Sequence, residues 1–576
     1  MLRKLFAAFS RTTPDASSQN ERGIAAWHSG DLIAAETCFR QALRAQPEYA
    51  AASSNLGMIL MEQRRFDEGM DFLKRAVSQD ETHVGARINL ANVLAYDGQS
   101  DAAIQHYQVA LRLNPENAIA RMNYVKPSMD ACDWQVAEAE TSRLEAEFSR
   151  GAGDWASRVI PLVSLLLPLP PQIPMAVAAD NAAMLRSRHG FAREQIQRLR
   201  PQTKNAKIRL AYLSGDFRNN AVGHQIAGMF DHHERNRFEI VAYSWGRDDA
   251  SSWRRRIEAG CDRFVDISAE SFEQSASRIA RDGVDIMVNL SGYGGGNRNE
   301  IFAMRPAPLQ IQWLAYPGTM AADFIDYVIA DEIVLPPENE PQFTEAVVRL
   351  PHCYQVNDDR QPIAATTPSR QEVGLPETGF VFCSFNQSYK VDRHVFACWM
   401  RLLDGVPGSV LWLLVTSATA RANLCAAAAA AGVAPQRLIF AGPLPKPEHL
   451  ARHRLADLFL DTWRINGGTT ASDALWAGLP LLTVLGRGFG TRVAASLLHS
   501  LGLPELIARD TGDYERIALH LARNPDVLRA VQARLEEAKK HSPLFDTRVF
   551  VLNFEKALEM MLQRQRDGLP PARFNV

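Results

Sequence analysis

The stretch INGGTTASD, residues 465–473, combines residue types that favour the binding of an anion. Adjacent glycines weaken any helix or strand that contains them, so they are useful only where the backbone bends tightly or lets another group approach. Residues 471–477 have the pattern of a helix that ends at a Gly-Leu-Pro sequence. The start of a helix brings free N–H groups and the positive end of the helix dipole together, which is a common site for anions. Ordinary helix capping by Thr469 or Thr470 is the alternative interpretation.

The bulk composition is that of a globular protein with several domains. The chain has 576 residues and a mass of 64.0 kDa, and a chain of this length is expected to divide into about three domains. Hydrophobic residues make up 46% and charged residues 22%, so there is enough apolar material for several cores. The formal net charge is −2, and the sequence has no local basic patch with interleaved aromatic residues. This balance argues against a nucleic-acid partner.

The cysteines and the apolar segments indicate the compartment. Seven cysteines, at positions 38, 132, 261, 353, 383, 398 and 425, are irregularly spaced and form no C-x-x-C pair. This pattern is not a disulfide framework or a zinc ribbon and fits a reducing compartment, so we expect a cytoplasmic protein. Residues 1–19 have an apolar run shorter than a secretory core, which predicts a mobile leader. The most apolar run, VIPLVSLLLPLPP from Val159, contains four prolines and is too short to span a membrane.

The first part of the chain is repetitive. Asn55, Asn89 and Asn123 recur at a spacing of 34 residues, and the segments GDLIAAETCFRQALRAQPEYA and GQSDAAIQHYQVALRLNPENA match by eye. A helix–turn–helix unit of about 34 residues is the signature of tetratricopeptide repeats. The repeats are clear between about residues 20 and 124, and we expect helical repeats of weaker pattern to continue to residue 200. Such repeats stack into a superhelix with a concave binding surface.

The pattern changes near residue 207, where strand-like and helical segments begin to alternate. Buried strands are predicted in KIRLAYLSGDF, VDIMVNLSGYGGG, FVFCSFNQ, DLFLDTW and PLLTVLG. Such alternation is typical of parallel sheets with helical crossovers. We therefore predict two α/β domains, residues 206–370 and 375–576, separated in the polar, proline-containing stretch 357–379, with the last helix packing back on the first domain. Ligands of open α/β sheets bind at the carboxyl ends of the strands, so the cleft between the domains is the expected site.

The combination resembles the O-linked N-acetylglucosamine transferase and SPINDLY family, which joins a tetratricopeptide solenoid to a two-domain nucleotide-sugar transferase of the GT-B type. The resemblance covers nearly the whole chain after residue 20. It is most specific in GYGGGNRNEIFAMRPAPLQIQWLAYPGT, residues 292–319, and extends to FNQSYK, residues 385–390, and to SPLFDTRVF near the C-terminus. A bacterial member of the family is the natural interpretation.

The resemblance implies a donor site in the second α/β domain. The stretch NGGTTASD would bind the diphosphate of a UDP-sugar at the start of a helix, and Asp473 would accept hydrogen bonds from the ribose hydroxyls. It also implies that Gln387 contacts the nucleotide or diphosphate, that Lys446 lies near the ribose and that His449 stacks on the uracil. Members of the family often carry a histidine where this chain has Gly468, which puts the contact of that side chain to the donor in doubt.

The leaving diphosphate needs a source of positive charge. Many glycosyltransferases hold a metal ion with a D-x-D motif, but no two aspartates of this chain are separated by a single residue. We therefore expect no metal and no other cofactor, and the charge must be met by protein donors. Lys390, at the end of FNQSYK, is the candidate: it follows an apolar strand at the predicted cleft, where the resemblance also places it. A solvated lysine is the alternative.

The acceptor side of the predicted site centres on His224, in GDFRNNAVGHQIAGMF. The family's histidine in this loop is assigned as a general base, and a histidine that titrates near neutrality suits that role. The family often has a second histidine where this chain has Asn220. Asp282 is an alternative proton relay, and an oxygen of the donor phosphate is another proton acceptor, which would need no side chain.

The resemblance implies an inverting transferase that moves N-acetylglucosamine from UDP-GlcNAc to Ser or Thr hydroxyls of proteins bound along the repeat groove. Two other functions stay open: a related transferase with another nucleotide sugar or acceptor, such as fucose from GDP, and a repeat scaffold with an impaired transferase domain. Gly468 and Asn220 favour the scaffold. The residues that argue against it are Gln387, Lys390, Lys446 and Asp473. We expect no membrane partner, and a homodimer is left open.

Overall fold

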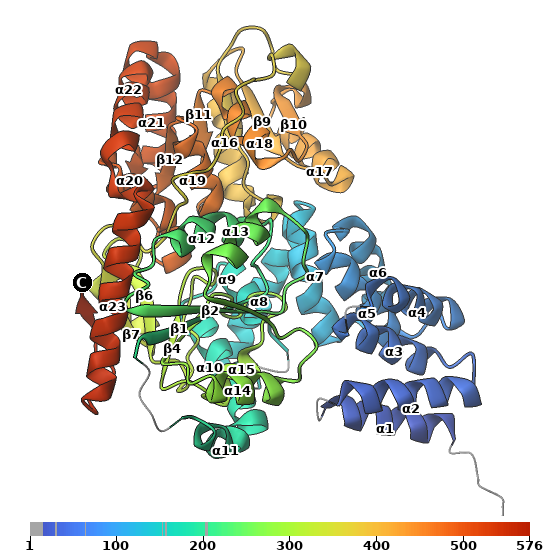
Figure 1. The fold of residues 1–576 in the computed structure, drawn as a ribbon. Helices are drawn as coiled ribbons and strands as arrows, with labels where there is room; N and C mark the ends of the chain where they lie inside the picture. The colour runs from blue at the N-terminus through green and yellow to red at the C-terminus, as the bar shows by residue number, and fades with distance from the viewer. Residues whose placement is uncertain (1–14, 29–30, 64, 152–153, 156–157, 202–205) are drawn as a thin grey trace, which may run out of the picture. The chain divides into compact units, whose positions relative to one another are not determined.

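The computed structural model describes residues 15–28, 31–63, 65–151, 154–155, 158–201 and 206–576 (Figure 1). The chain falls into two compact units, one up to Pro127 and one from Ser128 onward. The first helix begins at Ala16, inside the segment predicted to be a leader, and residues 1–14 of that segment lie outside the described residues. No helix in these ranges combines the length and the apolar character that a membrane span requires.

The first unit is a series of packed helix pairs, coloured blue in Figure 1. Its helices are α1 (Ala16–His28), α2 (Leu32–Ala45), α3 (Ala50–Glu62), α4 (Phe66–Gln79), α5 (Val84–Tyr96), α6 (Ser100–Leu113) and α7 (Ala118–Asp130), the last of which continues past the boundary. Small residues let the helices of a pair approach: a Cβ on Gly57 would lie 2.9 Å from the carbonyl oxygen of Gly69. Phe39 fills the space beside Leu56 and Ile59 in a fully buried cluster. The predicted helical repeats are confirmed.

The second unit begins with the helices α8 (Trp134–Ser149), α9 (Pro161–Leu166), α10 (Gln172–His189) and α11 (Arg193–Arg198). Helix α8 packs near α16 (Arg393–Gly405) of the second α/β domain, where the ring of Trp134 lies 5.7 Å from that of Phe396, whereas α10 and α11 pack on the first sheet. Ala178 and Leu185 of α10 and Ile196 of α11 share one buried cluster with Leu213 of that sheet. The prediction that the repeat region continues to residue 200 therefore differs from the structure, because these helices bury their apolar faces within the second unit.

In the described residues the first sheet has the order β14-β7-β6-β5-β4-β1-β2-β3, with neighbouring strands parallel. Its strands are β1 (Ile208–Ser214), β2 (Phe238–Ser244), β3 (Arg263–Asp266), β4 (Ile286–Asn289), β5 (Leu309–Gln312), β6 (Tyr327–Asp331), β7 (Ala346–Leu350) and β14 (Phe574–Asn575). The crossovers include α12 (Ala221–Ile226), α13 (Ser252–Gly260), α14 (Phe272–Arg281) and α15 (Asn299–Ala303). Strands such as β4 are buried along their whole length, as expected where helices cover both faces of a parallel sheet.

The second sheet repeats this plan, with the order β10-β9-β8-β11-β12-β13. Its strands are β8 (Val381–Ser384), β9 (Val410–Leu414), β10 (Leu438–Ala441), β11 (Leu458–Leu460), β12 (Leu481–Val484) and β13 (Ile507–Ala508). Its helices are α16 (Arg393–Gly405), α17 (Ala418–Ala430), α18 (Lys446–Arg452), α19 (Thr469–Trp476), α20 (Val493–Ser500), α21 (Thr511–Arg523) and α22 (Pro525–His541). The predicted fold class, helical repeats followed by two α/β domains, is confirmed.

Both sheets reverse their strand order at one point, between β1 and β4 in the first and between β8 and β11 in the second. Open parallel sheets bind ligands at such a point, outside the carboxyl ends of the strands, because the adjacent crossovers leave on opposite faces. Helix α12, which follows β1, packs near α19, which follows β11, so the two reversal points lie toward each other.

The last helix, α23 (Thr547–Arg566), returns to the first sheet and lies beside it in red in Figure 1. The indole of Trp313, which follows β5, lies 5.7 Å from the ring of Phe550 and 4.6 Å from that of Phe554. Glu555 is buried, and its carboxylate lies 2.8 Å from Nδ1 of His233. These contacts hold the two α/β domains together along one side.

Candidate active site

The start of α19 is open in the way that an anion site requires. Its N-cap is Gly468, which has no side chain to satisfy the first N–H groups of the helix. The capping alternative is therefore wrong, because Thr469 and Thr470 are already the first residues of the helix. The hydroxyl of Thr470 donates to Oδ1 of Asn386, which follows β8. The helix thus presents backbone donors, and its second threonine is tied to the neighbouring strand loop.

The two glycines before this helix have different roles. A Cβ on Gly467 would lie 2.7 Å from Oγ1 of Thr470, 2.9 Å from Oδ1 of Asn386 and 3.0 Å from the amide nitrogen of Ala471, so no side chain fits there. A Cβ on Gly468 would meet only Oε1 of Gln355 at 3.2 Å and a methyl group at 3.9 Å. The close approach of the backbone thus requires glycine at 467, whereas position 468 tolerates a side chain.

Lys390 lies beside this helix start. It ends a short 3-10 helix, Ser388–Lys390, after β8, and its Nζ donates to the carbonyl oxygen of Asn466 at 2.8 Å. Burial lowers its pKa to about 8, and the carboxylate of Asp461 opposes that effect. Gln387, predicted to contact the nucleotide, is exposed at the start of the same 3-10 helix. Its exposed side chain is therefore accessible to a ligand.

A buried ion pair lies one helical turn inside α19. Nζ of Lys446, the first residue of α18, lies 2.6 and 2.7 Å from the carboxylate oxygens of Asp473. Burial raises the pKa of Asp473, and the charge of Lys446 opposes the shift. Nε2 of His449 is 3.9 Å from the same carboxylate, and its ring lies 5.5 Å from that of Phe385. The structure therefore brings together the three residues that the resemblance assigned to ribose and uracil.

The His449 side chain is held in a fixed orientation. Its Nδ1 contacts the guanidinium of Arg452, which also lies over the ring of Phe385 at 4.5 Å. Burial lowers the pKa of His449 strongly, with further contributions from the nearby cations. The ring is therefore neutral at physiological pH, and a neutral ring is suited to stacking on a base.

His224 faces this group from the first domain. Its Nε2 lies 2.6 Å from Oδ1 of Asn219, and its ring lies 4.7 Å from that of Trp253. Burial lowers its pKa to about 3, and the positive charge of Lys446 adds to the shift. His224 is therefore uncharged near neutrality. Asn220 is the N-cap of α12 and accepts from the amide of Gly223 at 2.9 Å, so it has a structural use of its own.

Asp282 was predicted as an alternative proton relay, and the structure contradicts this role. It follows α14 and precedes β4, which places it at the amino-terminal edge of the sheet, opposite the edge where His224 lies. Its carboxylate accepts from the hydroxyl of Tyr243 at 2.5 Å and lies 3.0 Å from the guanidinium of Arg263. Its carbonyl oxygen accepts from Arg209. Asp282 ties strand starts together and is not part of the site.

Several residues of the site were missed by the sequence analysis. Asp461 directly follows β11, Asn386 lies two residues after β8, and both side chains are buried next to the turn at Gly467. Asp216 follows β1, where burial raises the pKa of its carboxyl and the Asn220 side chain donates to it. Gln355 donates to Ser472 of α19 at 2.7 Å. The first three share one usable signal, a polar residue at the carboxyl end of a buried parallel strand.

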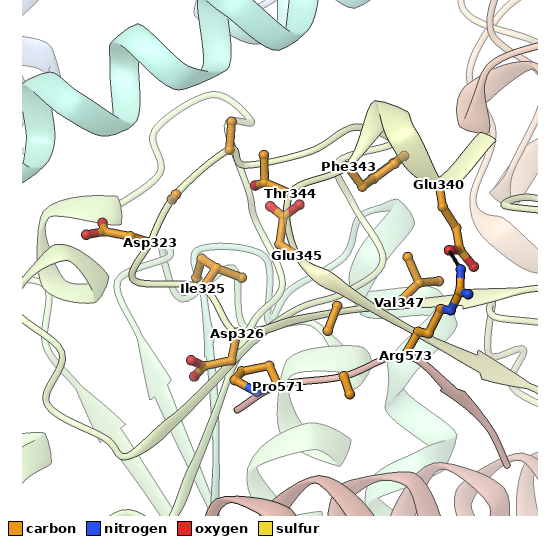
Figure 2. A pocket seen from close by; sticks show the side chains of 14 residues that line it. Asp323, Ile325, Asp326, Glu340, Phe343, Thr344, Glu345, Val347, Pro571 and Arg573 are labelled. Carbon is orange, nitrogen blue, oxygen red and sulfur yellow. Dashed lines mark hydrogen bonds and ion pairs between the residues drawn. The ribbon is translucent and has the colours of Figure 1, made fainter. Parts of the chain in front are cut away.

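A separate pocket of about 700 Å³ lies elsewhere, between residues 321–326, 340–347 and 571–573 (Figure 2). Its carboxylates already have partners. Glu340 is paired with Arg573 at 2.7 Å, as the dashed line in Figure 2 marks, and Asp326 with Arg305 at 3.0 Å. This pocket contains none of the predicted site residues. Over the described residues, no group of three or more His, Cys, Asp or Glu side chains is arranged to hold a metal ion.

Two family models match this chain. A model of glycosyl transferase family 41 matches residues 131–367 and 359–554, well over half of the chain. The chain belongs to glycosyl transferase family 41. A tetratricopeptide-repeat model matches residues 20–83 and 88–125, which corresponds to the first unit. The family predicted from the sequence motifs is thereby confirmed.

Relatives in family 41 extend the comparison. A probable UDP-N-acetylglucosamine–peptide N-acetylglucosaminyltransferase, SEC of Arabidopsis thaliana, is 39% identical over 376 residues, 64% of this chain and 38% of that protein. The corresponding enzyme of Caenorhabditis elegans is 28% identical over 562 residues, 76% of this chain and 48% of that protein. The chain thus spans less than half the length of these relatives. The solved structure of an O-GlcNAc transferase mutant from Thermobaculum terrenum is 26% identical with a TM-score of 0.67, covering 96% of this chain and 98% of that one.

Proposed function

We propose that this family 41 protein is an inverting glycosyltransferase that moves N-acetylglucosamine from UDP-GlcNAc to Ser or Thr hydroxyls of proteins. The observation that carries the proposal is the convergence of Lys390 with the uncapped start of α19, next to the buried Lys446–Asp473 pair. The relatives named above, which are UDP-N-acetylglucosamine–peptide N-acetylglucosaminyltransferases, suggest the donor and the acceptor class.

The donor diphosphate binds at the start of α19 in this proposal. The first N–H groups of the helix and the ammonium of Lys390 receive its oxygens, and Lys390 exchanges its bond to the carbonyl of Asn466 for one to phosphate. As the bond to the sugar breaks, negative charge grows on the leaving UDP. Preorganised donors stabilise that charge more strongly in the transition state than in the ground state. No step requires a metal ion or another cofactor.

The nucleoside lies toward α18. The carboxylate of Asp473 faces the ribose hydroxyls, and the charge of Lys446 opposes the rise in the pKa of that carboxyl that burial causes. The neutral ring of His449 stacks on uracil and is held by Arg452. Gln387, which is exposed in the loop after β8, contacts the nucleotide.

The acceptor hydroxyl approaches from the first domain, beside His224. A ring with a pKa of about 3 takes up a proton only weakly, so His224 orients the acceptor more than it accepts its proton. An oxygen of the leaving diphosphate receives the proton. This route needs no further side chain.

The repeat unit holds the acceptor protein. Asn55, Asn89 and Asn123 occupy equivalent positions of α3, α5 and α7, and each amide donates within the unit, to Asn20, Ser54 and Asn92 respectively. Partly buried amides at a regular spacing offer hydrogen bonds to an extended chain, as the concave surfaces of repeat proteins do.

Calorimetry with UDP and GDP in the presence of a chelator tests the donor, and mass spectrometry of protein acceptors incubated with UDP-GlcNAc tests the transfer. We expect UDP to bind with chelator present, GDP to bind more weakly, and each transfer to add one N-acetylhexosamine. Preference for GDP would indicate another donor, and binding of neither would indicate a scaffold. Loss of UDP binding with chelator would refute the metal-free site.

A further inference from the structure

Asp461 is a buried charge that the proposed reaction does not use directly. It follows β11, its side chain is fully buried, and both carboxylate oxygens have donors. Oδ1 accepts from the amide of Gly467 at 2.7 Å and from Nδ2 of Asn386 at 2.9 Å. Oδ2 accepts from the hydroxyl of Thr483 on β12 at 2.8 Å. A buried carboxylate is costly unless it is fully hydrogen-bonded, so the site maintains this charge at some expense in stability.

These donors connect Asp461 with both loops of the candidate diphosphate site. Gly467 begins the turn that leads into α19, and its amide is fixed by Oδ1. Asn386 belongs to the loop after β8, and its Oδ1 accepts from the hydroxyl of Thr470. The carboxylate thus determines where the turn at Gly467 lies and how Asn386 is oriented.

Asp461 and Lys390 also bind the same peptide unit, because Nζ of Lys390 donates to the carbonyl oxygen of Asn466 at 2.8 Å and the amide of Gly467 donates to Oδ1 of Asp461. Burial lowers the pKa of Lys390 to about 8, and Asp461 supplies the charge that raises it. Burial raises the pKa of Asp461 to about 6, and Lys390 and the three donors oppose that shift. The other titratable group at this position is Tyr514 of α21, whose hydroxyl donates to the carbonyl oxygen of Asp461 at 3.2 Å. Burial raises the pKa of Tyr514 well above its usual value, so the tyrosine stays neutral.

We propose that Asp461 is a positioning residue of the donor site, which preforms the turn at Gly467 and keeps the ammonium of Lys390 charged for the diphosphate. This inference rests on the proposed function for the ligand, but the link between Asp461 and Lys390 exists without one. Asp461 contacts no reacting atom and acts through Lys390 and the turn.

The variant Asp461→Asn removes the negative charge of the side chain but keeps its shape. The asparagine Oδ1 keeps both bonds to Gly467 and Asn386, and its Nδ2 donates to the hydroxyl of Thr483, which can rotate to accept. Thr483→Val is the matched control, because it removes one hydrogen bond to Asp461 and leaves the charge. UDP affinity of the full chain is measured by calorimetry from pH 5.5 to 8.5, after circular dichroism shows that each variant is folded.

At pH 5.5, where Asp461 is protonated in the wild type, we expect Asp461→Asn to bind UDP within about twofold of the wild type. At pH 8 we expect it to bind UDP at least about tenfold more weakly, because Lys390 of the variant loses its proton at a lower pH than Lys390 of the wild type. Thr483→Val should keep the wild-type pH dependence. In a second measurement, the ¹³Cε shift of Lys390 should titrate at a lower pH in Asp461→Asn than in the wild type.

The outcomes distinguish the inference from the proposed function. Equal pH dependence in Asp461→Asn and wild type, or a uniform loss at every pH, would overturn the charge role of Asp461. An unchanged titration of Lys390 would do the same without any ligand. If the wild type binds no UDP while the Lys390 titration still shifts, the proposed function fails and the coupling between the two residues stands.

Discussion

At the scale of residues, the candidate site uses two lysines in two different ways. Lys446 is held by both oxygens of Asp473 in a buried pair, so its charge is largely neutralised. Lys390 donates to a backbone carbonyl, which a phosphate oxygen can replace. In the proposed metal-free reaction, Lys390 is the side chain that meets the growing charge of the leaving group, so we expect the loss of this donor to be severe.

Lys390→Ala should reduce the rate of transfer far more than His224→Ala. Losing one preorganised donor costs on the order of 10²–10³ in rate, and a charged donor costs at least that much. His224→Ala should lower the rate by about 10² or less, which is the lower end of the effect of general acid–base catalysis, because a phosphate oxygen takes the proton. Product formation in single turnovers compares the two variants once both are shown to fold. Near wild-type turnover of Lys390→Ala would move the diphosphate stabilisation to the backbone of α19.

The titration of His224 should not contribute to the pH dependence of the rate between pH 5.5 and 8.5. Its pKa is lowered to about 3, so the ring stays neutral from about pH 5 upward and gains a proton only in strong acid. The profiles of kcat/KM for the wild type and for His224→Asn should therefore have the same shape between pH 5.5 and 8.5 and differ only in height. A limb near pH 6.5 that disappears in His224→Asn would show that the histidine titrates during the reaction.

At the scale of elements, the start of α19 depends on one glycine more than on its neighbour. A methyl group at 467 would meet three atoms at 3.0 Å or less, whereas a methyl group at 468 has one contact at 3.2 Å. The fold therefore explains the first glycine by the tight packing of the turn. The second glycine stands where the family often has a histidine, and the structure leaves room for a side chain there.

Gly467→Ala and Gly468→Ala form a matched pair. Gly467→Ala should displace the turn and weaken UDP binding at least about tenfold, roughly 1.4 kcal/mol. Gly468→Ala should change the affinity by less than about threefold, because small shifts of Gln355 relieve its contact. Calorimetry at pH 7 measures both. Equal effects of the two substitutions would mean that the turn adapts and that the close packing at 467 is not what fixes the site.

The last helix is a second element with a definable role. Glu555 of α23 accepts from the amide of Glu234 at 2.9 Å, and its carboxylate lies 2.8 Å from Nδ1 of His233, which is buried like Glu555 itself. Glu555→Ala leaves these donors unpaired and should lower the free energy of unfolding by about 2 kcal/mol. The exposed neighbour Lys556→Ala should stay within about 0.5 kcal/mol of the wild type. Urea unfolding followed by tryptophan fluorescence makes the comparison, and equal stabilities would remove Glu555 as an anchor.

At the scale of the whole molecule, the chain combines two units with separate cores. The cluster around Phe39 belongs to the repeat unit, and the clusters on the two sheets belong to the second unit. Every candidate donor residue lies after Ser128, on elements of the second unit. Donor binding and acceptor binding are therefore expected to separate on truncation.

Removing residues 1–127 should leave UDP affinity within about twofold of the full chain, because nearest-neighbour packing makes repeat units energetically separable. Modification of folded protein acceptors should fall by an order of magnitude or more, since the extended binding surface is lost. Calorimetry and mass spectrometry measure the two effects, and circular dichroism confirms that the truncated chain is folded. A large loss of UDP affinity in a folded truncation would show that the repeats contribute to the donor site.

The sequence by itself determined the features that depend on local pattern. The 34-residue spacing of Asn55, Asn89 and Asn123 predicted the repeats, and the alternation of apolar strands with helical segments predicted two parallel sheets. The same local signals predicted a helix from residue 471, two residues after its start in the structure, and the loop that carries Lys390, because ligand loops follow buried strands. Asp282 was misjudged although it precedes a strand, a position that already indicates the opposite edge of the sheet.

Tertiary structure alone decided which distant residues meet. Asp461 and Asn386 are 75 residues apart, and Lys446 and Asp473 are 27 apart, yet each pair shares short hydrogen bonds. The division after Pro127 could not be predicted from the sequence either. The segments that form α10 and α11 have helical patterns like those of the repeats, and only their packing partners in the structure show that they belong to the core of the second unit. The physical reason is the same in each case. The hydrophobic periodicity of a segment indicates which face of the helix or strand is buried. It does not indicate which other element packs on that face, because that depends on the order of the strands in the sheet.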